Sequence, residues 1–169
     1  MPEEKIFTPP KFCKSYERLI FLAGPIQGAK DWQNDAVKYL QSLDDALHIA
    51  SPRRIDDSSG DYSEQKYIGQ LDWEEYHLQK AWRNGVVMFW LAREFQHQCD
   101  RAYAQTSRFE LGESKVRHEV NWSKLVVGIE SGFSGERYIR RRFSIDCPDV
   151  LLKDSLKETC KEAVKLYRL

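Results

Sequence analysis

The stretch of this chain that most suggests chemistry is "QTSRFELGES", residues 105 to 114, which carries Glu110 and, two residues later, Gly112. A carboxylate on the first turn of a helix is held ionised by the helix dipole, as a nucleophile requires. A structural alternative competes, because Ser107, the predicted N-cap, and Glu110 have the S-x-x-E spacing of a capping box. Gly112 favours the functional alternative, since a glycine inside a helix costs about 1 kcal/mol relative to alanine and so indicates close packing or close approach.

A second group of titratable side chains lies in "QLDWEEYHLQKA", residues 70 to 81. On a helix, Glu74 and His77 are one turn apart, and Asp72 points to a different side from His77. Either Glu74 or His77 could exchange a proton with a substrate near neutral pH. The alternative is that these residues form the solvated face of an amphipathic helix.

Other residues have the chemistry to bind a ligand. The loop "AGPIQG", residues 23 to 28, could cradle a phosphate or sugar with backbone N–H groups, although an ordinary strand-to-helix turn is an equal alternative. Arg53 and Arg54 are either a solvated pair or an anion clamp. Trp73 and Trp90 are either core residues or a surface on which a base stacks.

These residues need a scaffold, and the hydrophobic pattern predicts one. Short apolar runs predict strands at residues 19–24, 47–52, 85–91 and 124–130, with a short fifth at 143–145. Apolar residues at helical spacing predict helices at residues 30–43, 64–84, about 107–116 and 155–164. A polar loop is expected at 53–63. Residues 1–17 contain three prolines and no periodicity, so we expect an irregular N-terminal arm followed by one domain over 18–169.

Strands that alternate with helices predict an α/β fold with a parallel sheet covered on both faces. In such sheets ligands bind outside the carboxyl ends of the strands, where the strand order reverses. The loops after the four main predicted strands should share this edge, and they contain "GPIQG", "SPRR", "LARE" and "ESGFSG". Glu110 belongs to the helix after the third strand, so we expect it near the same crevice.

Composition limits the classes of partner. The chain of 169 residues carries 26 basic and 26 acidic side chains, so no net field draws it to a nucleic acid polymer or to an anionic membrane. No apolar run approaches the roughly 20 residues of a membrane span. The four cysteines are scattered without a C-x-x-C pair, which suits reduced thiols in the cytoplasm and predicts no metal site. We expect no cofactor.

Several short pieces, taken in order, resemble the nucleoside 2-deoxyribosyltransferase-like family. They span about residues 18 to 132 and are "FLAGPI", Trp32, "PRR", "QLDWEEYHL", "VVMFWL", "FELG" and "LVVGIE". The resemblance implies a flavodoxin-like or Rossmann-like three-layer sandwich with a mostly parallel sheet of about five strands, usually in a homo-oligomer. It also implies cleavage of the N-glycosidic bond of a 2-deoxyribonucleoside or nucleotide, with the sugar passed to another base or to water.

Carried over residue by residue, the resemblance makes Glu110 of "ELG" the nucleophile that forms a covalent glycosyl-enzyme. The family places an aspartate that helps the leaving base about eight residues before the next strand. Here His77 occupies that position, with Glu74 one turn earlier, so we predict one of these two as the partner of Glu110. With the crevice rule, the predicted substrate-binding residues are Ala23, Gly24, Pro25, Ile26, Arg53, Asp72, Trp73, Trp90, Phe109 and Gly112.

Two alternatives to this enzyme stay open at the level of sequence. The altered shuttle position allows a nucleotide-binding or sensing module that has kept the pocket and lost efficient chemistry. Cleavage of a nicotinamide-type nucleotide is the other, with phosphates held by Arg53, Arg54 or the run Arg140 to Arg142.

Overall fold

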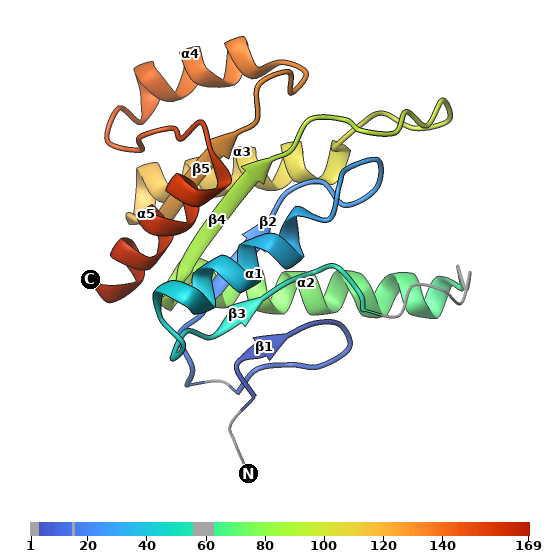
Figure 1. The fold of residues 1–169 in the computed structure, drawn as a ribbon, viewed down its shortest axis with the longest axis vertical. Coiled ribbons are helices and arrows are strands. Elements are labelled where there is room, and N and C mark those ends of the chain that lie inside the picture. The colour runs from blue at the N-terminus through green and yellow to red at the C-terminus, as the bar shows by residue number, and fades with distance from the viewer. Residues whose placement is uncertain (1–3, 15, 56–62) are drawn as a thin grey trace.

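A five-stranded, all-parallel sheet with helices on both faces forms the centre of the molecule (Figure 1). The computed structural model describes residues 4–14, 16–55 and 63–169. The predicted three-layer α/β fold is therefore confirmed. Part of the predicted polar loop at 53–63, and residues 1–3 and 15 of the predicted arm, lie outside the described residues.

The strand order places a topological switch point in the middle of the sheet. The order is β1-β3-β2-β4-β5, with β1 at Ile6–Phe7, β2 at Ile20–Ala23, β3 at Ile49–Ala50, β4 at Val86–Leu91 and β5 at Lys124–Ile129. From β2 the chain moves outward to β3 and then returns to the other side of β2 as β4. Loops leaving neighbouring strands therefore diverge above β2 and β4, which leaves a crevice at their carboxyl ends.

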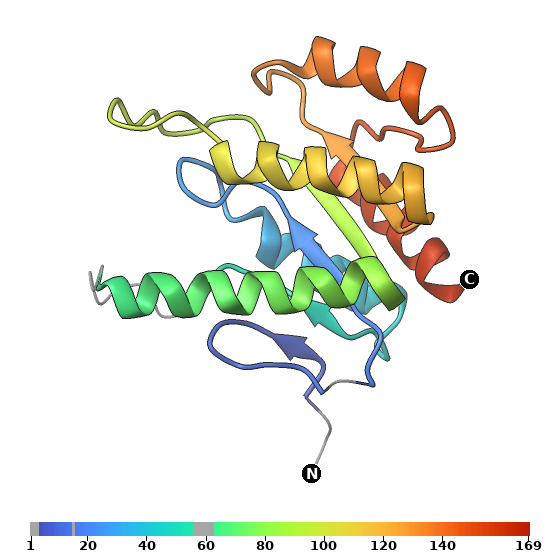
Figure 2. The same ribbon diagram turned by 180° about the vertical axis from the view of Figure 1, so that it is seen from behind.

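Successive strand residues point to opposite faces, and each face has its own helices. Ile20 and Leu22 pack in the layer of α1 (Trp32–Leu43) and α5 (Leu156–Arg168). Phe21 and Ala23 pack in the layer of α2 (Glu64–Asn84) and α3 (Gln105–Asn121), seen in front in Figure 2. Helix α4 (Glu136–Asp146) lies past β5. Burial of both faces explains why the strands are continuously apolar.

Two parts of the sequence prediction are wrong. The segment 143–145, predicted as a short strand, lies within α4, where Phe143 is the buried residue of an amphipathic helix. The predicted irregular arm contains β1, which pairs in parallel with β3 through Ile6 and Ile49. A two-residue edge strand beside prolines has no periodicity of its own, so only the tertiary pairing defines it.

Helix α2 projects beyond the sheet. Its 21 residues cover about 32 Å, whereas the six residues of β4 cover about 20 Å. The first turns of α2 therefore extend past the carboxyl ends of the strands (Figure 2). Ile68 and Leu71, two apolar residues of this projecting part, are exposed for that reason. The projecting half forms one wall above the crevice. No helix of the described residues is long and apolar enough to cross a membrane.

Candidate active site

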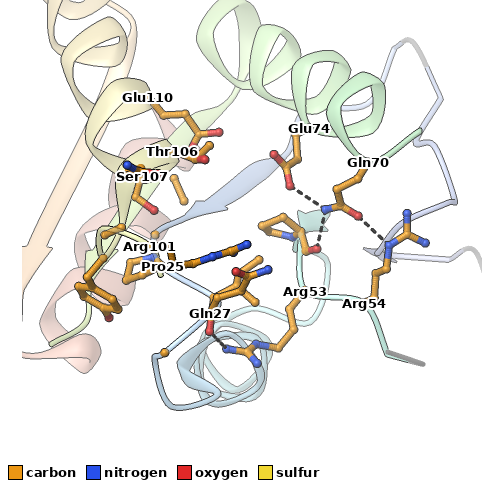
Figure 3. A pocket seen from close by; sticks show the side chains of 18 of the residues that line it. Pro25, Gln27, Arg53, Arg54, Gln70, Glu74, Arg101, Thr106, Ser107 and Glu110 are labelled. Atoms are coloured by element: carbon orange, nitrogen blue, oxygen red, sulfur yellow. Dashed lines mark hydrogen bonds between the residues drawn. The ribbon is translucent and has the colours of Figure 1, made fainter. Parts of the chain in front are cut away.

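A cavity of about 690 Å³ opens at the carboxyl ends of β2, β3 and β4 (Figure 3). Its walls are the loops after these strands and the facing sides of α2 and α3. This is the position that the strand order favours for a ligand. Of the residues predicted from sequence, the cavity brings together Ala23, Gly24, Pro25, Ile26, Arg53, Glu74 and Glu110.

Glu110 reaches the cavity from the second turn of α3. The helix begins at Gln105, after Ala104 takes a left-handed backbone conformation with φ 58°. The predicted N-cap at Ser107 is therefore wrong, because Ser107 is a buried residue within the first turn. The capping-box explanation for Glu110 fails with it, since the helix has already begun.

The Glu110 carboxyl group binds its proton tightly. Burial, together with the negative charges of Glu74 and Glu113, raises its pKa to about 8. The expected lowering by the helix dipole does not occur, because that effect is confined to the first turn of a helix and Glu110 lies beyond it. Glu110 is therefore protonated at pH 7 in this arrangement.

Glu74 faces Glu110 across the cavity from α2 (Figure 3). One turn earlier, Gln70 donates from Nε2 to Glu74 Oε1 at 2.6 Å. Arg54 in turn donates from Nε to Gln70 Oε1 at 2.8 Å. Burial raises the pKa of Glu74, while the Gln70 hydrogen bond and the Arg54 charge oppose that rise. The carboxyl groups of Glu74 and Glu110 thus differ. Glu74 has a hydrogen-bond donor and a nearby cation, whereas the pKa of Glu110 is raised by burial and by two carboxylates.

Glycines allow the loop after β2 to run close to neighbouring segments. Gly24 has φ +149°, and a Cβ there would collide with the Trp90 carbonyl oxygen and lie 2.7 Å from the Trp32 ring. The Gly28 carbonyl accepts hydrogen bonds from the backbone of Phe95 at 2.7 Å and of Gln96 at 3.0 Å. The loops after β2 and β4 are therefore tied together at the cavity rim.

Arg53 braces this loop. Its Nε donates to Gln33 Oε1 at 2.9 Å and lies 3.2 Å from Asp31 Oδ1, and its Nη2 donates to the Ile26 carbonyl at 3.2 Å. Arg53 thus lines the cavity, but its guanidinium is largely occupied by the protein itself.

The order of these features along the chain also matches a known family. A sequence model of the nucleoside 2-deoxyribosyltransferase-like family matches residues 17–131. The chain belongs to this family. A comparison with curated proteins finds no match. The matched region contains Glu74, Glu110 and the loop after β2, so the family assignment and the cavity concern the same part of the molecule.

His77, which the family resemblance suggests as the proton shuttle, does not line the cavity. His77 is fully buried on α2, under the N-terminal arm. Its Nε2 accepts from the Cys13 N–H at 3.2 Å, so its Nδ1 carries the hydrogen and donates to the Trp73 carbonyl at 2.7 Å. Burial lowers the pKa of His77 to about 4. The neutral imidazole joins the arm to the helix through the Cys13 hydrogen bond.

The structure also separates the remaining predicted residues from the cavity. Trp73 is fully buried beneath the arm, and Trp90 is buried in the opposite layer, with α1 and α5. Asp72 and Phe109 are exposed and do not line the cavity. Gly112 faces open space, with no atom within 4 Å of a Cβ placed there, so the close packing expected at this glycine is absent.

Sequence reasoning missed several residues of the cavity wall. Gln70 lies four residues before Glu74, on the same helix face, and that spacing was a usable signal. Arg101, Tyr103 and Thr106 come from the aperiodic stretch after β4, which carries no comparable signal. Tyr103 donates to the Ala92 carbonyl at 2.7 Å, and burial raises its pKa, so it stays a neutral donor that pins this stretch to the end of β4.

The cavity is therefore equipped for acid–base and nucleophilic chemistry. Two carboxyl groups from different helices face one open cavity, and a pair of carboxyl groups is what glycoside cleavage uses. Within the described ranges, no three His, Cys, Asp or Glu side chains are grouped as a metal site would require.

Proposed function

We propose that the protein cleaves the N-glycosidic bond of a 2-deoxyribonucleoside or its monophosphate, with Glu110 as nucleophile and Glu74 as acid and base. The observation that carries this proposal is the pair of facing carboxyl groups in one cavity at the switch point of the sheet. Membership of the nucleoside 2-deoxyribosyltransferase-like family supports the substrate class.

The first step needs one proton on the pair. When substrate binds, the proton that Glu110 holds passes to Glu74, directly or through water. The Glu110 carboxylate then forms a bond to C1′ of the sugar as the C1′–N bond breaks, and the electron pair of that bond stays on the base. Glu74 gives its proton to the departing base, so a neutral base leaves and a glycosyl ester remains on Glu110.

The second step reverses these roles. A second base, or water, loses its proton to Glu74 and attacks C1′, which releases the Glu110 carboxylate. The pair again carries one proton. The loop from Gly24 to Gly28, held in place by Arg53, lies where it can contact the sugar end of the substrate. Whether base or water is the acceptor depends on the shape of the cavity around the intermediate.

Chromatography of reaction mixtures tests this proposal. Deoxynucleosides, their monophosphates and a nicotinamide nucleotide are incubated with the protein, with and without a second base. Free base without an acceptor indicates hydrolysis, and exchanged nucleoside indicates transfer. The Glu110→Ala variant should lose roughly 10³-fold or more in rate, and Glu119→Gln, on the same helix outside the cavity, should keep it.

A covalent intermediate gives a second test. Rapid quenching and peptide mass analysis should find the sugar attached to the peptide that contains Glu110. Turnover that survives in the Glu110→Ala variant would contradict the assigned nucleophile.

A binding or sensing module is the second candidate, and the raised pKa of Glu110 favours it, because a protonated carboxyl group is no nucleophile. This candidate predicts that nucleotide raises the melting temperature and is recovered chemically unchanged. Accumulation of free base would exclude it.

A further inference from the structure

The side-chain amide of Gln70 is hydrogen-bonded to the Glu74 carboxyl group. Gln70 donates from Nε2 to Glu74 Oε1 at 2.6 Å and to the Pro52 carbonyl at 3.0 Å. Its Oε1 accepts from Arg54 Nε at 2.8 Å. If the amide were flipped, its oxygen would face two acceptors and its NH₂ would face a cation. The three contacts therefore fix one orientation of the amide.

That orientation presents an N–H donor to Glu74. A donor of this kind stabilises a carboxylate more than a protonated carboxyl group. Glu110, on the opposite wall, receives no hydrogen bond from a described residue. The hydrogen bond from Gln70 contributes most when Glu74 gives up its proton, because the carboxylate that forms then lies next to the Gln70 N–H donor.

Other charged groups also lie around the Glu74 and Glu110 carboxyl groups. Arg54 acts on Glu74 from the loop after β3, and Glu113 acts on Glu110 from α3. The remaining charged or titratable groups on the cavity walls are Asp31 and Arg53, which pair with each other, Lys66 and Tyr67 on α2, and Glu94, Arg101 and Tyr103 after β4. None of these described groups donates a hydrogen bond to the Glu74 carboxyl group. Within the described residues, that donor is the Gln70 side chain.

We propose that Gln70 is a positioning residue for the N-glycoside cleavage: braced by Arg54 and Pro52, it aims Glu74 into the cavity and stabilises the carboxylate that forms when the leaving base is protonated. This inference rests on the proposed function for its catalytic meaning. The effect of Gln70 on the ionisation of Glu74 can be measured without turnover.

The test compares Gln70→Met, which keeps the volume and removes the donor, with Gln65→Met, an exposed position on the same helix outside the cavity. Loss of a hydrogen bond to a charged group should shift the first deprotonation of the pair up by about one pH unit. The acid limb of the kcat/KM profile should move by that amount. The basic limb should stay in place, because Glu74 is ionised on both sides of it.

Carboxyl titration by NMR, with ¹³C in the glutamate side chains, gives the readout that needs no activity. The first step of the pair should move up by about one pH unit in Gln70→Met and stay in place in Gln65→Met. The Gln70→Glu variant keeps the shape and adds a negative charge, so its shift should be larger. Gln70→Glu also tests the proposal if Gln70→Met fails to fold.

Each outcome has a separate meaning. An unchanged titration step in Gln70→Met overturns the proposal, whether or not the protein turns over substrate. A uniform loss of kcat with neither limb displaced also overturns it, because that result indicates a merely structural role. If the titration shifts and no substrate is cleaved, the proposed function fails while the control of Glu74 by Gln70 stands.

Discussion

At the scale of single residues, ionisation of Glu110 in the folded protein costs free energy. Its carboxyl group ionises at about pH 8 in the folded chain and at about pH 4.3 in an unfolded one. Between these values the folded state binds more protons, so the contribution of Glu110 makes the fold less stable as the pH rises. A carboxyl group with so strongly raised a pKa, in a cleft, is typical of functional sites.

Replacement of Glu110 by glutamine should therefore stabilise the protein while it abolishes catalysis. Glutamine resembles the protonated form and has no charge to bury. We expect the free energy of unfolding of Glu110→Gln to exceed that of the wild type by about 1–3 kcal/mol at pH 9 and by little at pH 4. Urea unfolding at the two pH values measures this difference. An equal difference at both would contradict the assigned pKa.

Arg101 should distinguish a nucleoside from its monophosphate. It lines the cavity, and no described residue forms an ion pair or side-chain hydrogen bond with it, whereas Arg53 is engaged by the loop. We expect Arg101→Ala to raise KM for a monophosphate about tenfold and to leave KM for the nucleoside unchanged. Steady-state kinetics with both substrates measure the ratio, and Arg83→Ala, outside the cavity, is the control. Equal effects on both substrates would remove Arg101 from phosphate binding.

At the scale of elements, the N-terminal arm covers one face of α2 and leaves another face open to the cavity. Trp73 donates to the Lys11 carbonyl at 2.6 Å, Tyr76 donates to the Cys13 carbonyl at 2.9 Å, and His77 accepts from the Cys13 N–H. The side of α2 that carries Trp73 and His77 is thus covered by residues 11–13. Glu74 lies on the side that is left to the cavity.

The His77→Gln substitution should accordingly show whether His77 acts in folding stability or in catalysis. Glutamine can still accept the Cys13 hydrogen bond, so we expect kcat within about threefold of the wild type, against a loss of roughly 10²–10⁴-fold in Glu74→Gln. In the wild type, the unfolded chain binds a proton at His77 near pH 6.5 and the folded chain only near 4. Stability should therefore fall as the pH drops through this window, and that part of the fall should vanish in His77→Gln.

Urea unfolding at several pH values, with kcat for both variants, checks this prediction. A His77→Gln variant as inactive as Glu74→Gln would return the histidine to the catalytic machinery.

The sequence predicted the elements well where periodicity is strong and poorly at their ends. The long helix α2 and the apolar strands β2, β4 and β5 follow from their patterns. The start of α3 did not, because Ala104 begins it through a left-handed backbone and leaves no capping side chain to recognise. Of the candidate site, Glu110, Glu74 and the loop after β2 were predicted. The covering of His77 depends on the arm, which has no pattern to analyse.

At the scale of the whole molecule, helix α3 presents an unexpectedly apolar surface to solvent. Phe109, Val116 and Val120 are 76%, 55% and 69% exposed, and with Gly112 they recur every three or four residues along one side of the helix. Trp122, at the end of the helix, is 76% exposed. Contiguous apolar patches of this kind mark interaction sites more often than free surface.

The family resemblance predicts a homo-oligomer, and this apolar side of α3 is where we expect the subunits to meet. Gly112 lets another backbone approach closely, which explains a helical glycine that packs against nothing within the chain. Because Glu110 leaves the same helix toward the cavity, a subunit bound here would also hold α3 rigid beside the carboxyl pair. Sedimentation velocity should show an oligomer for the wild type at micromolar concentrations.

Val120→Lys should shift that oligomer to monomer, since it buries a charge in the contact. Ile145→Lys is the control for a lysine at an exposed apolar position outside α3, because Ile145 is 56% exposed on α4 and should leave the assembly intact. In a monomer, Gly112→Ala should stabilise the helix by about 1 kcal/mol, whereas at a close subunit contact its methyl group should weaken association. A monomeric wild type, or dissociation by Ile145→Lys as well, would show that the exposed side of α3 is not the interface.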